Sequence, residues 1–393
     1  MKQQYIKQKL KQLNFLQITP IQKQMFNNFE KPYHLVCVAP TGTGKTHAYL
    51  LPILSKINWQ KNTIQAIIIT PTNELGWQIL NMLKKIEPKI ANIKILYGGI
   101  NKQKISDHFK KKQPPLLITT LSKLNEYVLS NKLLKIHKLD FLVLEEADML
   151  FDQDSLSILD IILTKCNPKI IIVSASITDK LKPFINKYFG KNLFLNTTKE
   201  HKLKLNYYNL LTTSEQKLKT LIHLTQNINP YISIIFVSNI KEQAKIYEAM
   251  VQKNLKVICF SSALNTKKRK QYINDIQKAK YQYIIASDIM ARGLDLDIDL
   301  VIHYDLPHKN LDFFQHRNGR TGRMEKSGDI IILMTEKDEL FLNEIQKKLN
   351  ISFKQIQFNN KKNQYSLIAP QNNRNINKIS KNKKYISTRK ITK

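Results

Sequence analysis

The chain has 393 residues, 42% of them hydrophobic, and its 63 Lys and Arg against 30 Asp and Glu give a formal net charge of +33. This length exceeds what one hydrophobic core usually serves, and no apolar run approaches the roughly 18 residues of a membrane span, so we expect two domains and no membrane segment. The charge favours a polyanion such as nucleic acid over an acidic protein or a small molecule, although abundant Lys, Asn and Ile are also typical of an AT-rich genome.

The three cysteines, Cys37, Cys166 and Cys259, have no short mutual spacing and lie in or beside apolar runs. Disulfide frameworks and metal sites need closely patterned cysteines, so we expect buried thiols in a reducing compartment. The segment from Met1 to Leu10 is polar and lysine-rich and lacks the apolar core of a signal peptide. We therefore expect a soluble cytoplasmic protein.

Short apolar runs alternate with longer, helix-compatible polar stretches along most of the chain. Runs that are apolar throughout are typical of parallel strands covered by helices on both faces. We predict an α/β fold with two domains, each built on a mainly parallel sheet. The predicted strands are Leu35–Ala39, Ala66–Thr70, Ile93–Tyr97, Leu116–Thr119, Phe141–Leu144 and Ile170–Ser174, then Ile232–Val237, Val257–Phe260, Tyr283–Ala286, Leu300–Tyr304 and Asp329–Met334.

Composition places the domain boundaries. We assign residues 1–196 and 214–358 to the two domains, because the alternation is interrupted between 197 and 213, although a Leu-Asn-Tyr-Tyr-Asn-Leu segment there has the composition to pack. Residues 360–393 contain ten Lys or Arg and no acidic residue. Such a composition predicts that 359–393 is a disordered basic tail, which either binds phosphates without reading sequence or is a solvated terminus with no role.

A phosphate-binding loop is predicted where the first strand ends, at Ala39 to Thr46, which reads A-P-T-G-T-G-K-T. Backbone N–H groups at a helix N-terminus point at bound anions, so Lys45 would reach the β- and γ-phosphates of a nucleotide and Thr46 a Mg²⁺ ion. Ala39 stands where this kind of motif usually begins with glycine, and the alternative is a glycine turn before a surface helix. The remaining predicted loop contacts are Thr41, Gly42, Thr43 and Gly44.

Three acidic residues follow the strand Phe141–Leu144 in the sequence Glu145-Glu146-Ala147-Asp148. In a nucleotide-hydrolysing domain Glu145 would hold Mg²⁺, and Glu146 would position or deprotonate the attacking water. Alone, these residues are typical of a solvated helix start, but the phosphate loop upstream favours the catalytic interpretation. The segment Ser174-Ala175-Ser176 by itself indicates only a turn or a helix cap.

Eight short segments follow one another in order along the chain. They are T-P-I-Q at 19–22, A-P-T-G-T-G-K-T at 39–46, P-T-N-E-L at 71–75, G-G at 98–99, E-E-A-D at 145–148, S-A-S at 174–176, A-R-G-L-D at 291–295 and H-R-N-G-R-T-G-R at 316–323. Glycine and arginine, both scarce in this chain, are retained in these segments, where backbone freedom or a planar five-donor group is hard to replace. This ordered set resembles the DEAD-box RNA helicases. The match runs from Tyr5 to about Gly328 and implies two tandem RecA-like domains, with ATP, Mg²⁺ and RNA bound between them.

The resemblance implies four further contacts to the nucleotide. Gln22 reads the edge of adenine, as an amide with both a donor and an acceptor can, and Thr19 belongs to the same motif. Tyr5 stacks on the base. Asp295 lies near the ribose.

The resemblance also implies catalytic and coupling residues. Arg320 and Arg323 face the γ-phosphate and stabilise charge in the transition state, which for such arginines is worth roughly 10³–10⁵ in rate. The alternative for Arg317, Arg320 and Arg323 is a basic surface stretch. Ser174, Ser176 and His316 couple hydrolysis to RNA binding.

RNA contacts are implied mainly to phosphate and 2′-OH groups, which suits action on many sequences. The chain departs from the family pattern at Asn73, at Thr120-Leu121-Ser122-Lys123, which stands for Thr-Pro-Gly-Arg, and at Ser261-Ser262. In the family the Pro-Gly step begins a helix that bends one RNA strand. Its loss in this chain is therefore expected to affect the separation of RNA strands more than RNA binding. The implied RNA-binding residues are Pro71, Thr72, Gly98, Gly99, Thr120, Arg269, Ser287, Asp288 and Gly293.

We therefore expect an ATP-dependent RNA helicase that binds single strands and unwinds short duplexes or remodels RNA–protein complexes. The family has Asp at the position of Glu145, and the longer side chain should disturb the position of Mg²⁺, so we expect slow ATP hydrolysis. The alternatives are an ATP-gated RNA clamp or chaperone with weak hydrolysis and a DNA helicase or translocase of the same superfamily. The expected partner is RNA, bound largely without sequence preference by a monomer, with the ribosome or the RNA-degradation machinery as larger candidate partners.

Overall fold

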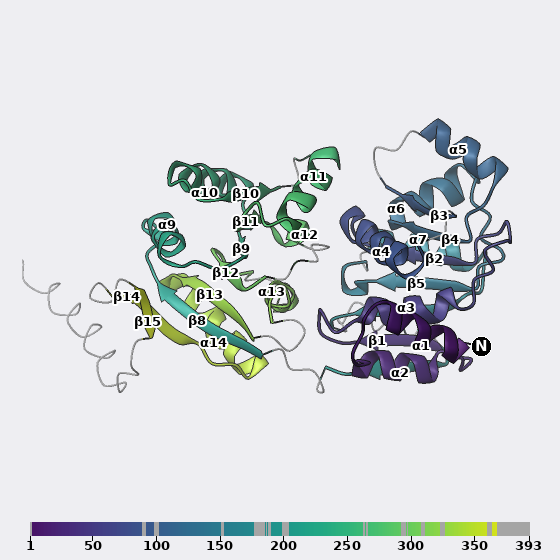
Figure 1. The fold of residues 1–393 in the computed structure, drawn as a ribbon, viewed down its shortest axis with the longest axis horizontal. Coiled ribbons are helices and arrows are strands. Elements are labelled where there is room, and N and C mark those ends of the chain that lie inside the picture. Colours follow the sequence, from purple (N-terminus) through teal and green to yellow (C-terminus); the bar gives the residue numbers. More distant parts are fainter. Residues whose placement is uncertain are drawn as a thin grey trace, which may run out of the picture. The chain divides into compact units, whose positions relative to one another are not determined.

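The computed structural model describes residues 2–88, 92–97, 102–150, 153–176, 185, 187, 190–198, 204–261, 264, 266–291, 296, 298–307, 311–322, 327–359 and 364–367. They form two sheets with packed helices (Figure 1). The chain divides into two compact units, Met1–Asn206 with Pro230–Ile330 and Tyr207–Asn229 with Ile331–Lys393. Within the described ranges, no helix has the length and apolar character needed to cross a membrane.

The first sheet has seven strands in the order β3-β4-β2-β5-β6-β1-β7, and every neighbouring pair is parallel. Its central strands are apolar at nearly every position, as expected for strands buried on both faces. The strands are β1 (His34–Val38), β2 (Ala66–Ile69), β3 (Ile93–Leu96), β4 (Leu116–Thr119), β5 (Phe141–Glu145), β6 (Lys169–Ser174) and β7 (Asn192–Asn196).

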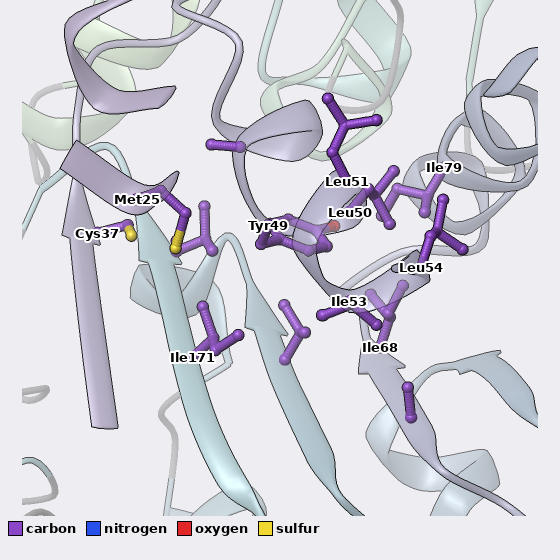
Figure 2. Close-up of a cluster of buried hydrophobic side chains, with 14 of the residues drawn as sticks. Met25, Cys37, Tyr49, Leu50, Leu51, Ile53, Leu54, Ile68, Ile79 and Ile171 are labelled. Atoms are coloured by element: carbon purple, nitrogen blue, oxygen red, sulfur yellow. The ribbon is translucent and has the colours of Figure 1, made fainter. Parts of the chain in front are cut away.

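Alternate residues of these strands enter two separate hydrophobic cores, because successive side chains of a strand point to opposite faces. Val36 and Val38 pack into the core that includes α5, α6 and α7, whereas Leu35 and Cys37 pack into the core that includes α2, α3 and α4. Figure 2 shows the second core, where side chains of α3 such as Tyr49 lie against the sheet. The helices of this half are α1 (Lys2–Gln12), α2 (Pro20–Asn28), α3 (Lys45–Leu54), α4 (Asn73–Ile86), α5 (Lys102–Lys111), α6 (Leu121–Asn125) and α7 (Gln153–Leu163), with a π-helical turn at Glu126–Ser130 and a 3-10 turn at Ala147–Met149.

The second sheet has eight strands in the order β10-β11-β9-β12-β13-β8-β14-β15. Strand β15 ends the sheet and pairs antiparallel with β14. The strands are β8 (Lys204–Leu211), β9 (Ser233–Phe236), β10 (Val257–Phe260), β11 (Tyr283–Ala286), β12 (Leu300–His303), β13 (Ser327–Met334), β14 (Lys354–Asn359) and β15 (Gln364–Leu367). The helices are α9 (Lys217–Asn227), α10 (Ile240–Gln252), α11 (Thr266–Gln277), α12 (Asp288–Ala291), α13 (Leu311–Asn318) and α14 (Glu339–Leu349), with a 3-10 turn at Glu336–Asp338.

All eleven predicted strands are present, but two predicted segments need correction. Strand β8 lies inside the stretch 197–213 that we took as a linker, because its alternating side chains half-bury one face in the sheet. Strand β15 lies inside the predicted tail, because pairing with β14 satisfies its backbone although its composition is polar. The expectation of buried thiols is right for Cys37, whereas Cys166 and Cys259 are only partly buried.

Candidate functional site

The predicted phosphate loop lies between β1 and α3, as a strand, a loop and a helix in sequence. Gly42 and Gly44 have φ of 80° and 82°, values that L side chains rarely adopt. A Cβ atom on Gly44 would also lie 2.5 Å from Nε2 of Gln22, so a side chain there would displace the Gln22 amide. Since every residue of α3 from Ala48 to Leu54 is buried, the alternative of a glycine turn before a surface helix is wrong.

The ammonium group of Lys45 is buried and held by its own loop. It donates to the carbonyl oxygens of Ala39 at 2.6 Å and Pro40 at 2.9 Å. Burial lowers the pKa of Lys45, while the carboxyl groups of Glu145 and Glu146 act in the opposite direction. A buried cation at the start of a helix is therefore placed to receive an anionic ligand.

Two carboxyl groups lie beside this cation, where β5 ends. Thr46 Oγ1 donates to Glu145 Oε1 at 3.2 Å, and the next residue, Glu146, adopts a left-handed backbone conformation with φ of 47°. Burial raises the pKa of Glu145 to about 7, with Lys45 opposing the rise and Glu146 adding to it. Oε2 of Glu145 and Oε2 of Glu146 are buried and accept no hydrogen bond from any described residue.

These unpartnered oxygens test whether the site fits Mg²⁺. Magnesium prefers a hydroxyl, a carboxylate and several waters or phosphate oxygens as ligands. Thr46 and Glu145 supply the first two, and a divalent cation would compensate the buried negative charge. The residues present therefore fit the ion.

Tyr49 is a neighbour of this site that the sequence reasoning missed. It is fully buried on α3, three residues after Thr46, a spacing that places both on the same face of the helix. Burial raises the pKa of Tyr49, and the nearby Glu145 carboxyl group contributes to the rise. The available signal was this helical spacing from the phosphate loop.

Asp148 brings together the three residues that we expected to couple hydrolysis to RNA. Ser174 Oγ lies 2.7 Å from Asp148 Oδ1 and 2.6 Å from the carbonyl oxygen of Ser176. His316 Nε2 lies 3.3 Å from Asp148 Oδ2. The sequence reasoning quoted Asp148 in the acidic segment but gave it no role.

The arginines of α13 and the following turn are buried. Arg317 is 1% exposed and Arg320 4%, so the alternative of a basic surface stretch is wrong for both. Arg317 makes two parallel hydrogen bonds to Asp288, of 2.6 and 2.7 Å. The carboxylate of Asp288, which we expected to contact RNA, thus accepts from a buried arginine. The charge of Arg320 contributes to the lowered pKa of Lys45, which places it near the phosphate loop.

The adenine-motif residues are joined to the phosphate loop. Thr19 caps α2 in a reciprocal pair of hydrogen bonds with Gln22, and Gln22 Nε2 donates to the carbonyl oxygen of Gly44 at 3.3 Å. Tyr5 is half-buried on α1 and donates to Glu87 Oε1 at 2.6 Å. Gln22 therefore lies at the loop, and Tyr5 lies against the end of α4.

The expected RNA-binding residues lie at several helix starts. Pro71 and Thr72 precede α4, where Thr72 caps the helix by accepting from the N–H of Leu75. Thr120 precedes α6, which begins at Leu121 although the Pro-Gly step is missing. Ser287 precedes α12.

Arg269 on α11, also expected at RNA, is paired with a carboxylate. Its Nη1 lies 2.5 Å from Oε1 of the buried Glu74 on α4. Glu74 is a second residue that the sequence reasoning quoted without a role. The remaining predicted site residues, Gly98, Gly99, Gly293, Asp295 and Arg323, lie outside the described part of the chain.

Known proteins resemble this chain along most of its length. Residues 19–184 match the DEAD/DEAH box helicase family model, and residues 214–325 match the helicase conserved C-terminal domain. The DEAD-box ATP-dependent RNA helicase CshB of Listeria monocytogenes is 33% identical over 374 residues, which cover 91% of this chain and 83% of that protein. CshB of Bacillus subtilis is 33% identical over 354 residues, which cover 88% and 80%.

Solved structures share the fold. S. cerevisiae Dbp5 bound to RNA and ADP BeF3 superposes with a TM-score of 0.80 at 23% identity, covering 89% of this chain and 93% of Dbp5. The DEAD-box helicase Mss116 bound to ssRNA and UDP-BeF gives 0.78 at 22% identity, covering 91% and 78%. The two sheets are thus those of two RecA-like domains. Helicase family models match both halves of the chain, and relatives that are one-third identical cover most of its length. Together with the geometry of the site, these matches show that this protein belongs to the DEAD-box ATP-dependent RNA helicase family.

Proposed function

We propose that this protein is an ATP-dependent RNA helicase that binds single-stranded RNA and locally unwinds short duplexes or remodels RNA–protein complexes. One observation carries the proposal: the half-buried Lys45, Thr46 and Glu146 and the buried Glu145 gather where β1 and β5 end, in a chain one-third identical to named RNA helicases. A first domain of residues 1–196 and a second domain that begins with β8 and ends with β15, residues 204–367, are part of the proposal, and the family-model matches at 19–184 and 214–325 support this division.

In this proposal each residue of the site has a separate role in ATP hydrolysis. Lys45 exchanges its loop carbonyls for phosphate oxygens. Thr46 and Glu145 would hold Mg²⁺, which neutralises phosphate charge when bound. Glu146 orients the attacking water, and Arg320 stabilises charge that develops on the transferred group.

Several finer assignments belong to the same proposal. The Glu-Glu-Ala-Asp segment acts as the variant form of the family's acidic motif, with Glu145 in the metal position. The protein acts in the cytoplasm as a monomer, and the ribosome or the RNA-degradation machinery is its larger partner. The charge of +33 supports a polyanionic partner of this kind.

The decisive experiment is ATP hydrolysis measured with and without single-stranded RNA, at saturating Mg²⁺. We expect several-fold stimulation by RNA and little by DNA of the same sequence. Stimulation by DNA equal to that by RNA would favour the translocase alternative. A chain that binds ATP and hydrolyses none, with or without RNA, would contradict the helicase function.

A second candidate is an ATP-gated RNA clamp with weak hydrolysis. Glu145 in place of the family's Asp and the missing Pro-Gly step at Thr120-Leu121-Ser122-Lys123 favour it. The two candidates differ in turnover. A clamp would hold RNA in the presence of ATP for longer than one hydrolysis event and leave a short duplex intact.

A further inference from the structure

The unit formed by Tyr207–Asn229 and Ile331–Lys393 contains a cavity that none of the residues assigned above lines. It has a volume of about 570 Å³ and lies between α9 and the β14–β15 pair. Sites for small organic ligands usually have volumes of about 300–1,000 Å³. The cavity is therefore large enough for a planar ring system with substituents.

Three aromatic rings form one wall of this cavity. Phe358 and Tyr365 lie opposite each other in the β14–β15 register, with ring centroids 5.2 Å apart. The ring of His223, on α9, lies 4.4 Å from that of Phe358, and its Nδ1 lies 2.8 Å from the Tyr365 hydroxyl. Because each ring contacts the other two, the wall is a preorganised surface. Phe358 and Tyr365 are only partly buried, so ring surface is left for a ligand.

Polar groups at the start of α9 form another part of the lining. Gln216, which immediately precedes α9, and Lys219, in its first turn, are three residues apart, and both are exposed. Lys219 has no carboxylate partner among the described residues. This part of the lining thus offers amide donors and an acceptor and one available ammonium group.

We propose that this cavity binds a base of single-stranded RNA, as an anchor separate from the nucleotide site; the choice of RNA as the nucleic acid rests on the proposed function. Aromatic side chains bind bases by stacking whatever their sequence, the amide of Gln216 suits a base edge, and Lys219 suits the adjoining phosphate. The sequence segments that flank β15 are also positively charged. Lys361 and Lys362 occur between the two strands, and residues 368–393 carry eight Lys or Arg and no acidic residue.

An apolar peptide fits less well, since only one wall is aromatic and the lining at the start of α9 is amide and ammonium. An acidic peptide would use the lysine but leave the rings unused. Stacking, edge recognition and phosphate binding in one cavity favour a nucleotide unit of a strand.

The test uses the full-length protein and a short oligouridine containing 4-thiouridine, without ATP, so that the nucleotide-dependent state does not contribute. After irradiation, cross-linked peptides are mapped by mass spectrometry, and RNA affinity is measured for Tyr365→Leu, Phe358→Leu and Lys219→Gln. Leucine keeps an apolar side chain and removes the ring. Matched controls are Tyr231→Leu, a tyrosine 70% exposed outside the cavity, and Lys347→Gln on α14.

We expect cross-links at Tyr365, Phe358 or His223, and affinity about 5- to 100-fold weaker in Tyr365→Leu, the range for losing one stacked base. Lys219→Gln should give a smaller loss, both controls none, and RNA-saturated ATP turnover should stay unchanged in every variant. Thermal unfolding shows whether each variant folds. If the leucine variants do not fold, the proposal is tested by the RNA affinity of Lys219→Gln and by the cross-links of the unmodified chain.

The proposed RNA-binding role of the cavity would be overturned by cross-links confined to other segments together with unchanged RNA affinity in Tyr365→Leu and Lys219→Gln. The same result is expected if a protein segment, rather than RNA, fills the cavity. Failure of the proposed function is a different result, the absence of RNA-stimulated hydrolysis by the unmodified chain. Cross-linking at the cavity without such stimulation would support the anchor and reject the helicase.

Discussion

Thr46 Oγ1 donates a hydrogen bond to Glu145 Oε1 across 3.2 Å, which joins the first turn of α3 to the end of β5. The two groups that we assign to the metal are therefore already in contact. The contact uses Oε1 of a carboxylate that reaches one methylene further than that of aspartate, and leaves Oε2 without a partner among the described residues.

Replacing Glu145 by Asp should raise ATP turnover, because the shorter carboxylate releases Thr46 and leaves room for the ion with its waters. Disturbed metal positioning typically costs about 10–100-fold, so the gain should reach about tenfold. Turnover is measured at saturating Mg²⁺ and RNA, with Glu145→Gln as the control of equal length and no charge. An unchanged or lower rate in Glu145→Asp would show that the loop has adapted to glutamate.

Replacing Glu146 by Gln should preserve ATP binding and lower turnover by at least about 100-fold, the usual contribution of a general base. Lys45→Ala should instead abolish turnover by weakening nucleotide binding. Equilibrium binding of a fluorescent ATP analogue separates the two effects. Turnover at the unmodified rate in Glu146→Gln would disprove the role of Glu146.

His303 should make stability depend on pH. It is buried beside Arg317, which donates to its Nδ1, so the ring is neutral and its Nε2–H faces Asn318 at 2.9 Å. Burial, then the Arg317 charge, lowers the pKa of His303 to about 3, against 6.5 for an unperturbed histidine. The folded chain therefore binds this proton more weakly than the unfolded chain. The stability that neutral His303 contributes is complete above about pH 6.5 and falls by up to about 1.4 kcal/mol per unit as the pH drops towards 3.

The comparison is with His303→Gln, which does not titrate. We expect the unmodified chain to have the higher unfolding temperature at pH 7.5, because its ring packs 5.0 Å from that of Phe314. The difference should shrink as the pH is lowered below 6.5. Parallel curves for the two proteins across this range would contradict the assignment.

Replacing Gln22 by Ala should weaken ATP more than GTP, because the amide is the group proposed to read adenine. The variant also loses the reciprocal cap with Thr19, worth about 1 kcal/mol, so a lower unfolding temperature is expected as well. Gln22→Glu keeps the acceptor for the Thr19 N–H and removes the donor, and so separates recognition from capping. Equal binding of ATP and GTP by the unmodified chain would remove the basis for this role.

Deleting residues 368–393, which spares β15, should weaken RNA binding and flatten its salt dependence, because eight basic residues are lost. RNA-saturated ATP turnover should change little. An identical salt slope with and without this segment would favour a solvated terminus without a role.

The apolar runs predicted strands well wherever a strand is buried on both faces, as β2 and β4 are. They missed β7, β8, β14 and β15, which are partly exposed and carry polar residues among the apolar ones, so burial by tertiary contacts decides the structure rather than local composition. Site residues within one motif were found from the sequence alone. Asp148 and Glu74 gained partners 168 and 195 residues away, His316 and Arg269, and no local pattern contains that information.

The bond from Gln22 Nε2 to the Gly44 carbonyl oxygen ties the side chain proposed to read adenine to the loop proposed to hold phosphate. An amide nitrogen carries two N–H groups and this bond uses one of them, so the second is left for a base. Under the proposed role, one side chain contacts both the base and the backbone of Gly44. The position of the base and the conformation of the phosphate loop would then depend on each other.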